Sequence, residues 1–489
     1  MRKTIGILLL SAVIMPVQAQ RVLSLDSCRL MALRNNKQLG ISKLRQDVAE
    51  NARKSARTKY LPHVSAIGTY EFTSEEISIL NDGQKAALGN LGTSVGGTLQ
   101  STLGSLVASL PPASQMQMAQ DMAQLAGNLN QRGQNIVDAF RTDTRHIFAG
   151  SILVSQPVFM GGSILALNKM ADIQTAMAQN HLDARCQATI YQIDQAYWQV
   201  VSLHHKKALA ESYLALVKKF DSDVHKMIDE GVATRSDGLS VDVKVNEAEM
   251  TLTKVNDGLV LSRMLLNQLC GLPLNEPVTL QDEQADNIAV VELVPQLDVE
   301  RAVANRPELK LLQNTVDLSR QATNVLKAGN LPQVALVGGY AVSNPNVING
   351  FERKFGGFWH VGVIVRVPIW NWGDVMYKVR AAKGATAIAN LEFEEAREKI
   401  ELQVNQTTFK VDEANKKLTM AQKNIQRADE NLRTANLGFC EGVISPTVVM
   451  EAQTAWLQAQ SQKIDAEIEV KLSQVDLQKS LGTLNASIK

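Results

Sequence analysis

The chain has 489 residues, of which 45% are hydrophobic and only 5% are aromatic. Its 50 basic and 49 acidic residues almost cancel, which argues against a nucleic acid or a strongly charged partner. Four cysteines are too few for a disulfide framework, and the low aromatic content favours long helices over a β-sandwich.

The N-terminus has the pattern of an export signal. Two basic residues precede a short apolar run at 5–10, and the small residue Ala19 precedes the expected cleavage point. A membrane anchor is the alternative, but the run is too short to span a bilayer and Pro16 interrupts it. We therefore predict that residues 1–19 are a signal peptide, whose removal leaves the mature chain with a net charge of −1 because it carries two basic residues and no acid.

The rest of the chain is a tandem repeat. Residues 31–70 match 301–340 at a constant offset of 270, and residues 150–271 match 361–482 at an offset of 211. A repeat of this length without gaps indicates one structural plan used twice. The change of offset places 59 extra residues in the first copy.

The repeat predicts a division into a first copy, a linker and a second copy. The predicted bounds are 20–270 for the first repeat, 271–296 for an equatorial linker and 297–489 for the second repeat. The extra residues form an insertion at about 81–135 that is rich in Gly, Ser, Gln and Met and poor in charge. A mobile loop is one interpretation of this insertion, and a helical lid over a pore, built from 113–128, is the other.

Each copy contains two segments that alternate between apolar and polar residues. The predicted strands lie at about 62–72 and 146–158 in the first copy, and at 332–343 and 358–368 in the second. Each is about ten residues long, the length with which a tilted strand crosses a bilayer. Four strands of an ordinary sandwich are the alternative.

Long helical patterns follow each strand pair. The first hairpin is predicted over 162–270 with a tip near Gly231, and the second over 374–482 with a tip near Gly442. The returning helices carry apolar residues at alternating spacings of four and three, which is typical of a coiled-coil seam. A first helix of nearly 70 residues is about 100 Å long at ~1.5 Å per residue. Single helices at about 22–59 and 297–329 lead into the first strand of each copy.

Four strands cannot close a membrane sheet in one chain, because unpaired backbone groups in lipid cost several kcal/mol each. Two chains supply eight strands and three chains supply twelve. Only the wider ring leaves room for a pore. The sequence therefore predicts a homotrimer.

The order of these features resembles the TolC-type outer-membrane factor family, also called outer-membrane efflux proteins. The resemblance rests on Leu-Pro before the first strand of each copy (Leu61-Pro62 and Leu331-Pro332), a proline and a glycine at each strand-to-helix junction, and the two tip turns. It implies a mixed, mainly α fold with an internal tandem repeat: a transmembrane β-barrel, twelve-stranded as a trimer, continuing into a long α-helical coiled-coil barrel in the periplasm. It also implies that the tips close as an iris and dock a periplasmic adaptor.

Carried onto this chain, the family's tip patterns give candidate gate residues. The first tip keeps the hydroxyl and the aspartate of the family, as Ser236 and Asp237. The second keeps an aromatic residue, Phe439, and the last acid, Glu451, but has Ile444 where the family has an arginine.

An ionic latch of the family's kind is therefore not expected here. A latch would use other residues of the two tips, and the full candidate set is Gly231, Arg235, Ser236, Asp237, Phe439, Glu441, Gly442, Ile444 and Glu451. For Asp237 the alternative is a helix-capping acid. For Glu451 it is a solvated outer-face side chain rather than a ring of acids that prefers cations.

Other motifs add little chemistry. Adjacent His204 and His205 point to different helix faces, so we expect no metal site there. Three cysteines fall at one level of the helices and are interpreted as buried small apolar residues, whereas Cys440 lies at the tip, too far to pair with them. No nucleotide-binding or hydrolase motif occurs, so we expect neither an enzyme nor a cofactor.

The sequence thus predicts a passive outer-membrane exit duct of a tripartite efflux pump or type I secretion system, partnered by an adaptor, an inner-membrane transporter and outer-membrane lipid. The alternative is a periplasmic coiled-coil scaffold without channel activity. The cargo is not encoded in any recognisable motif.

Overall fold

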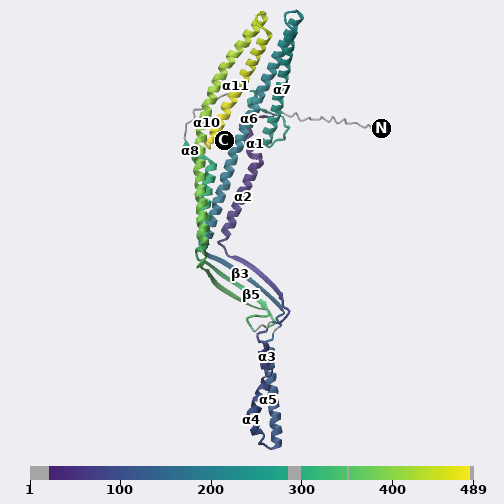
Figure 1. The fold of residues 1–489 in the computed structure, drawn as a ribbon, viewed down its shortest axis with the longest axis vertical. Coiled ribbons are helices and arrows are strands. Elements are labelled where there is room, and N and C mark those ends of the chain that lie inside the picture. The colour runs from purple at the N-terminus through teal and green to yellow at the C-terminus, as the bar shows by residue number, and fades with distance from the viewer. Residues whose placement is uncertain (1–20, 77, 142, 285–298, 350–351, 485–489) are drawn as a thin grey trace, which may run out of the picture. The chain divides into compact units, whose positions relative to one another are not determined.

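The structure is a computed structural model that describes residues 21–76, 78–141, 143–284, 299–349 and 352–484. The predicted signal peptide and residues 285–296 of the predicted linker lie outside these ranges. Contacts divide the chain into two units (Figure 1). The first comprises 1–54, 168–323 and 380–489, and the second comprises 55–167 and 324–379. The mainly helical fold with a four-stranded sheet confirms the predicted mixed, mainly α fold of one chain.

Most of the first unit is built from two antiparallel helical hairpins. One pairs α6 (Ser163–Asp229) with α7 (Arg235–Cys270), and the other pairs α10 (Asp374–Cys440) with α11 (Pro446–Ser480). The bounds lie within a few residues of those expected. α6 and α10 each have 67 residues, so each is about 100 Å long.

No helix in the described part of the chain has both the length and the apolar character needed to cross a membrane.

The N-terminal segment packs against the first hairpin in a buried belt. Strand β1 (Arg21–Leu23) pairs in parallel with β4 (Val278–Leu280), and a 3-10 turn, η1 (Gln281–Gln284), follows β4. The Tyr197 hydroxyl on α6 donates a hydrogen bond of 2.5 Å to Asp282, and Arg263 on α7 donates to the buried Glu283 at 3.0 Å. These polar contacts fix the first part of the linker onto α6 and α7.

The helices that lead into the strands are each broken once, where the sequence predicted them to be continuous. The first breaks into α1 (Leu25–Asn35) and α2 (Lys37–Thr58), and the second into α8 (Val299–Asn305) and α9 (Pro307–Lys327), which is followed by η2 (Ala328–Asn330). The breaks, at residues 36 and 306, occupy equivalent positions of the repeat. Asn36 accepts hydrogen bonds from the backbone of Gln38 and so caps α2, whereas α9 begins with a proline, which lacks the N–H that a longer helix would need.

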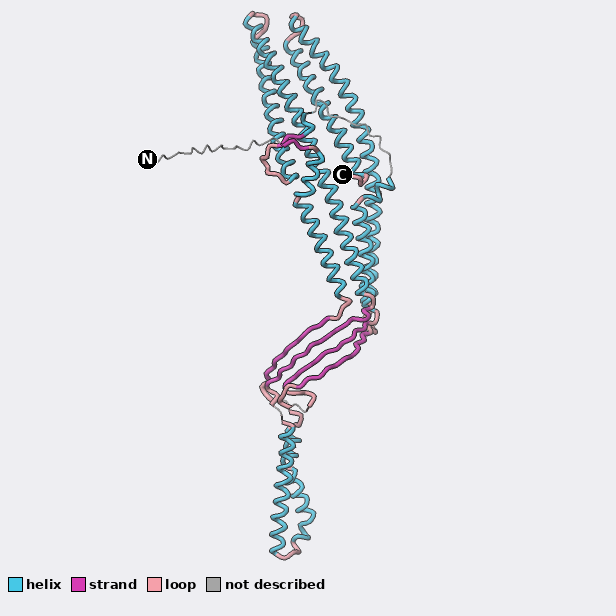
Figure 2. Tube along the Cα trace, turned by 180° about the vertical axis from the view of Figure 1, so that it is seen from behind, coloured by secondary structure: helices cyan, strands magenta, loops and turns pink. Residues whose placement is uncertain are grey.

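The second unit contains one four-stranded antiparallel sheet in the order β2-β3-β5-β6, drawn in magenta in Figure 2. The strands are β2 (His63–Phe72), β3 (His146–Met160), β5 (Gln333–Asn344) and β6 (Gly356–Arg366). The predicted bounds differ from these by at most two residues. A register shift between Pro157 and Phe159 marks a bulge where proline provides no N–H.

The register brings the apolar positions of all four strands onto one face of the sheet. Val64 lies opposite Val154, Val154 opposite Gly338, and Gly338 opposite Val361. Other members of this apolar face are Tyr70, Phe72, Phe148, Ile152, Leu336, Tyr340, Trp359 and Val363. The opposite face mixes apolar residues with polar ones that include Ser65, Thr69, Glu71, Ser151, Ser155, Ser343 and His360.

Of the two interpretations of the insertion, the structure agrees with helix rather than loop, including over 113–128. The insertion consists of α3 (Asp82–Gly89), α4 (Leu91–Val107) and α5 (Pro112–Ala139). Two glycines allow these helices to touch: a Cβ at Gly92 would lie 2.0 Å from the Ala126 carbonyl oxygen, and one at Gly133 would lie 1.8 Å from that of Leu88. Helix formers such as Ala, Met and Gln over 113–128 were the signal for helix, and the many glycines obscured it.

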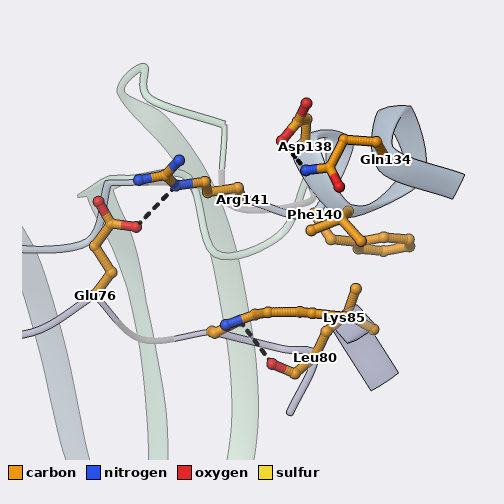
Figure 3. Close-up of a pocket in the computed structure, with 9 residues that line it drawn as sticks. Glu76, Leu80, Lys85, Gln134, Asp138, Phe140 and Arg141 are labelled. Atoms are coloured by element: carbon orange, nitrogen blue, oxygen red, sulfur yellow. Dashed lines mark hydrogen bonds and ion pairs between the residues drawn. The ribbon is translucent and has the colours of Figure 1, made fainter. Parts of the chain in front are cut away.

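A pocket of about 290 Å³ lies at the base of the insertion (Figure 3). Arg141 Nε donates to Glu76 across 3.2 Å, and this ion pair joins the chain leaving β2 to the chain approaching β3. Gln134 donates to Asp138 at 3.4 Å on the same rim. The Arg141–Glu76 ion pair anchors both ends of the insertion near the end of the sheet that carries the β2–β3 and β5–β6 connections.

Candidate functional site at the helical tips

The first tip is a tight turn closed by backbone hydrogen bonds. Gly231 has a φ of 76°, a conformation that favours glycine, and Val232 N–H donates to the Met227 carbonyl at 2.8 Å. Thr234 then caps α7: its hydroxyl accepts from Asp237 N–H at 3.3 Å, while Asp237 accepts from Thr234 N–H at 3.0 Å. Arg235 and Ser236, both exposed, follow in the first turn of α7.

Asp237 therefore acts as the capping acid, the alternative raised for it in the sequence. Its carboxylate also accepts from the Thr234 hydroxyl at 2.6 Å. This hydrogen bond, followed by that from the Thr234 backbone, lowers the pKa of Asp237 below its ordinary value. The ionised Asp237 carboxylate thus makes its hydrogen bonds to Thr234, within the same tip.

The second tip repeats the turn but not the cap. Gly442 has a φ of 72°, and Val443 N–H donates to the Gly438 carbonyl at 2.8 Å. Ser445 occupies the N-cap of α11 without making a side-chain hydrogen bond, and Pro446 begins the helix. The fold at this tip relies on proline and packing instead of a capping box.

The predicted hydrophobic candidates at the second tip point into the protein. Phe439 is buried and lies 5.0 Å, centroid to centroid, from Phe220 of α6. Ile444 folds back over Gly438, where an added Cβ would lie only 2.5 Å from the Ile444 side chain. These two residues therefore help to hold the tip together within one chain.

One apolar cluster joins both tips. Its buried members are Phe220, Val224, Val241, Leu432, Ala435, Phe439, Val449, Met450 and Ala452, drawn from all four long helices. The two hairpins therefore end as one packed body.

A groove of about 700 Å³ runs between α6 and α10 at this end. Phe220, Met227 and Phe439 supply apolar lining, and Lys219 and Glu441 supply charge. Gln453 of α11 also lines it, 1% exposed, and its Nε2 has no hydrogen-bond partner among the described residues. The groove thus offers an apolar surface with a buried amide donor still to be satisfied.

The remaining charged candidates stay separate. Arg235, Glu441 and Glu451 are exposed, and no ion pair links any of them to another group within the described residues. The structure thus gathers Phe439 and Ile444 into the tip core, uses Asp237 for capping, and leaves three charged side chains at the surface.

Sequence reasoning missed an ionic cluster just above the first tip. Asp221 and His225 of α6 and Asp242 of α7 place ligand-type atoms within 4.8 Å of one another. His225 Nδ1 lies 3.0 Å from the Asp221 backbone carbonyl and 3.3 Å from its carboxylate. The backbone hydrogen bond, followed by the charges of Asp221, Asp242 and Asp229, raises the pKa of His225. The i, i+4 spacing of Asp221 and His225 was visible in the sequence, but the contribution of α7 was not.

Comparisons with solved structures find the same fold in two outer-membrane channels. The outer-membrane channel OprN shares the fold with a TM-score of 0.73, at 16% identity, over 94% of this chain and 90% of that one. The CmeC outer-membrane channel of Campylobacter jejuni does so with a TM-score of 0.70, at 14% identity, over 95% and 87%.

Sequence comparison finds matches to the same group of proteins. Residues 299–483 match the family model described as outer membrane efflux protein. The outer membrane protein TolC of Vibrio cholerae is 21% identical over 349 residues, which are 69% of this chain and 77% of that relative. These matches confirm the recognition of the TolC-type outer-membrane factor family.

Proposed function

We propose that this chain is the outer-membrane exit duct of a tripartite efflux pump or type I secretion system, passively conducting substrates out of the cell. Its sheet lies in the outer membrane and its helical hairpins lie in the periplasm. The family is one of channel proteins, and we infer no catalytic role for this chain.

The observation that carries the proposal is the uncovered apolar face of the sheet. Val361 and Trp359 on β6 are each 76% exposed, and Ile152 on β3 is 52% exposed. Every residue of β2 is exposed as well. An apolar face of this extent in water is a liability, whereas lipid is its natural solvent.

Aromatic residues flank this face as interfacial anchors do. Tyr70 and Phe148 pair across β2 and β3 with ring centroids 4.8 Å apart, near the end where the insertion begins. Beyond the other end, Trp370 and Trp372 are 75% and 85% exposed. Tyrosine and tryptophan are enriched at both membrane surfaces of such barrels. Their presence at both ends of this sheet therefore supports a sheet that spans the bilayer.

The sheet's two open edges support a homotrimer. β2 and β6 are the outer strands, and within one chain each pairs on one side only. In lipid the unpaired backbone groups would cost several kcal/mol each. Pairing β6 of one protomer with β2 of the next in three copies removes every edge and gives twelve strands, four from each chain.

The groove between α6 and α10 is the surface we assign to the periplasmic adaptor, whose partner is an inner-membrane transporter. An adaptor segment with apolar side chains and a carbonyl or carboxylate would cover Phe220 and accept from Gln453. Gly231, Gly442 and the exposed Arg235, Glu441 and Glu451 complete the tip surface.

A periplasmic scaffold remains the competing function, and fractionation separates the two. We expect the protein in detergent extracts of the outer membrane, as a trimer that falls to monomer on SDS gels only after heating. Recovery as a monomer in the soluble periplasmic fraction would overturn the exit duct and leave the scaffold.

Ion selectivity tests the acidic tip candidates. If Glu451 lines the lumen in three copies, replacing it with Gln should reduce cation preference in planar bilayers, because the ring loses three charges. The Asp237→Asn variant serves as a comparison, since Asp237 is already engaged with Thr234. Unchanged reversal potentials in the Glu451 variant would remove that residue from the lumen.

A further inference from the structure

Two of the four cysteines lie together in the buried belt. Cys28 on α1 and Cys270 at the end of α7 are both 0% exposed, although 242 residues separate them in the chain. The Cys270 thiol donates to the Cys28 carbonyl oxygen at 3.9 Å, and both cysteines belong to the same buried apolar cluster. Cys186 and Cys440 do not share this site.

Independent contacts hold α1 against the two helices of the first hairpin, α6 and α7. Arg29, next to Cys28, donates to both carboxylate oxygens of the buried Asp194 at 2.7 and 2.6 Å. Asn35, at the end of α1, donates to the Cys270 carbonyl at 3.2 Å. A Cβ at Gly271 would lie 2.5 Å from that of Asn35, so glycine there permits the close contact. The thiols are therefore fixed side by side by groups that do not depend on sulfur chemistry.

We propose that Cys28 and Cys270 form a disulfide bond in the exported protein. The inference uses the proposed function only for the compartment, since the bacterial periplasm is oxidising. The oxidant is a disulfide of the exchange type, either a periplasmic dithiol oxidase in its oxidised form or glutathione disulfide. One protein thiolate attacks a sulfur of the oxidant and forms a mixed disulfide. The second then displaces the oxidant's remaining sulfur, so the oxidant is reduced to two thiols that carry the two protons.

The buried position of the two thiols decides when this exchange can take place. Because both sulfurs are fully buried, exchange must occur before the belt closes or during its opening. Once formed, the bond would tie α1 to the end of the first hairpin and resist external reductants.

The test uses the full chain extracted from the outer membrane. The unreduced protein is denatured with iodoacetamide present, digested and analysed by mass spectrometry. We expect one linked peptide pair containing Cys28 and Cys270 that disappears on prior reduction, while Cys186 and Cys440 are alkylated. Alkylation of all four cysteines, or a link to Cys186, would overturn the proposal.

Matched variants and an oxidation step complete the design. The double variant Cys186→Ser, Cys440→Ser should keep the link, whereas Cys28→Ser should leave Cys270 alkylated. Should the protein be absent from the membrane fraction, the proposed function falls. The disulfide is then decided by treating purified reduced protein with glutathione disulfide in enough denaturant to open the belt, which should give the same linked pair and overturns the proposal if it does not.

Discussion

At the scale of single residues, the two tips solve the same capping problem differently. Thr234 and Ser445 occupy equivalent positions of the repeat, but only Thr234 forms a capping box, with Asp237. Val448 stands where the second copy would need the acid. Differences between the copies, among them Asp237 against Val448 and Arg235 against Pro446, therefore give one helix start a capping box and the other none.

This contrast gives a prediction with its own control. Thr234→Ala should destabilise the start of α7 by about 1 kcal/mol, roughly fivefold in the local opening equilibrium, because the freed N–H groups lose their acceptor. Ser445→Ala should have a much smaller effect. Hydrogen exchange of the two tips, followed by mass spectrometry, measures both, and equal effects would contradict the assignment.

The charge on Asp237 adds a pH dependence to that cap. Since its folded pKa lies below the ordinary value of 3.8, the stabilisation is complete above that value and is lost as the pH falls through the folded pKa. Near neutral pH the cap of α7 is therefore fully formed.

His225 gives a dependence of the opposite sign. Its folded pKa is raised above the ordinary 6.5 by the Asp221 carbonyl and the surrounding acids, so its contribution is complete below 6.5 and is lost as the pH rises through the folded value. Exchange protection of the α6–α7 tip should therefore fall with rising pH after correction for intrinsic rates. In His225→Gln the dependence should vanish, and its persistence would show that another group is responsible.

At the scale of elements, the positions of the four strands could be predicted from the sequence, whereas the register in which they pair could not. Alternation along 62–72 and 358–368 located the strands, since each residue step reverses the face. Which residue lies beside which depends on pairings between residues 13 to 196 positions apart, and alternation within one strand contains no such information. The aligned apolar face therefore came from the tertiary structure.

Substitutions at two neighbouring residues of β3 test whether the apolar face of the sheet contacts lipid. Ile152 belongs to the apolar face and Ser151 to the opposite one. Ile152→Lys should cost on the order of 2–4 kcal/mol in the membrane and reduce the yield of heat-modifiable trimer, because it places a charge in lipid. Ser151→Lys on the same strand should leave the yield close to wild type. Equal yields from both variants would contradict a lipid-facing assignment.

The insertion shows the limit of composition at this scale. Its glycines indicated a loop, yet Gly92 and Gly133 serve as contact points between helices. A glycine that permits close packing and a glycine that permits a turn look alike in a sequence, because the difference lies in a neighbour distant along the chain.

At the scale of the whole molecule, the tips are the surface at which further proteins would dock. Gly442 has open space around its Cβ position, so a side chain there would project outward. Gly442→Trp should abolish export by the assembled pump without loss of trimers, because bulk at the tip blocks the adaptor. Gly442→Ala shares the unfavourable φ and adds little bulk, so it should retain most export. Equal loss in both variants would assign the effect to strain in the turn.

The sequence by itself determined the tandem plan, the four strands and the two long hairpins, because these depend on periodicity and on turns that are local along the chain. Only the tertiary structure decided which tip residues are used up within the protomer. Asp237 caps α7, and Phe439 and Ile444 pack in a core shared between the two hairpins. It also brought Cys28 to Cys270 and His225 to Asp242. Each of these outcomes depends on a neighbour from another helix, which local periodicity cannot specify.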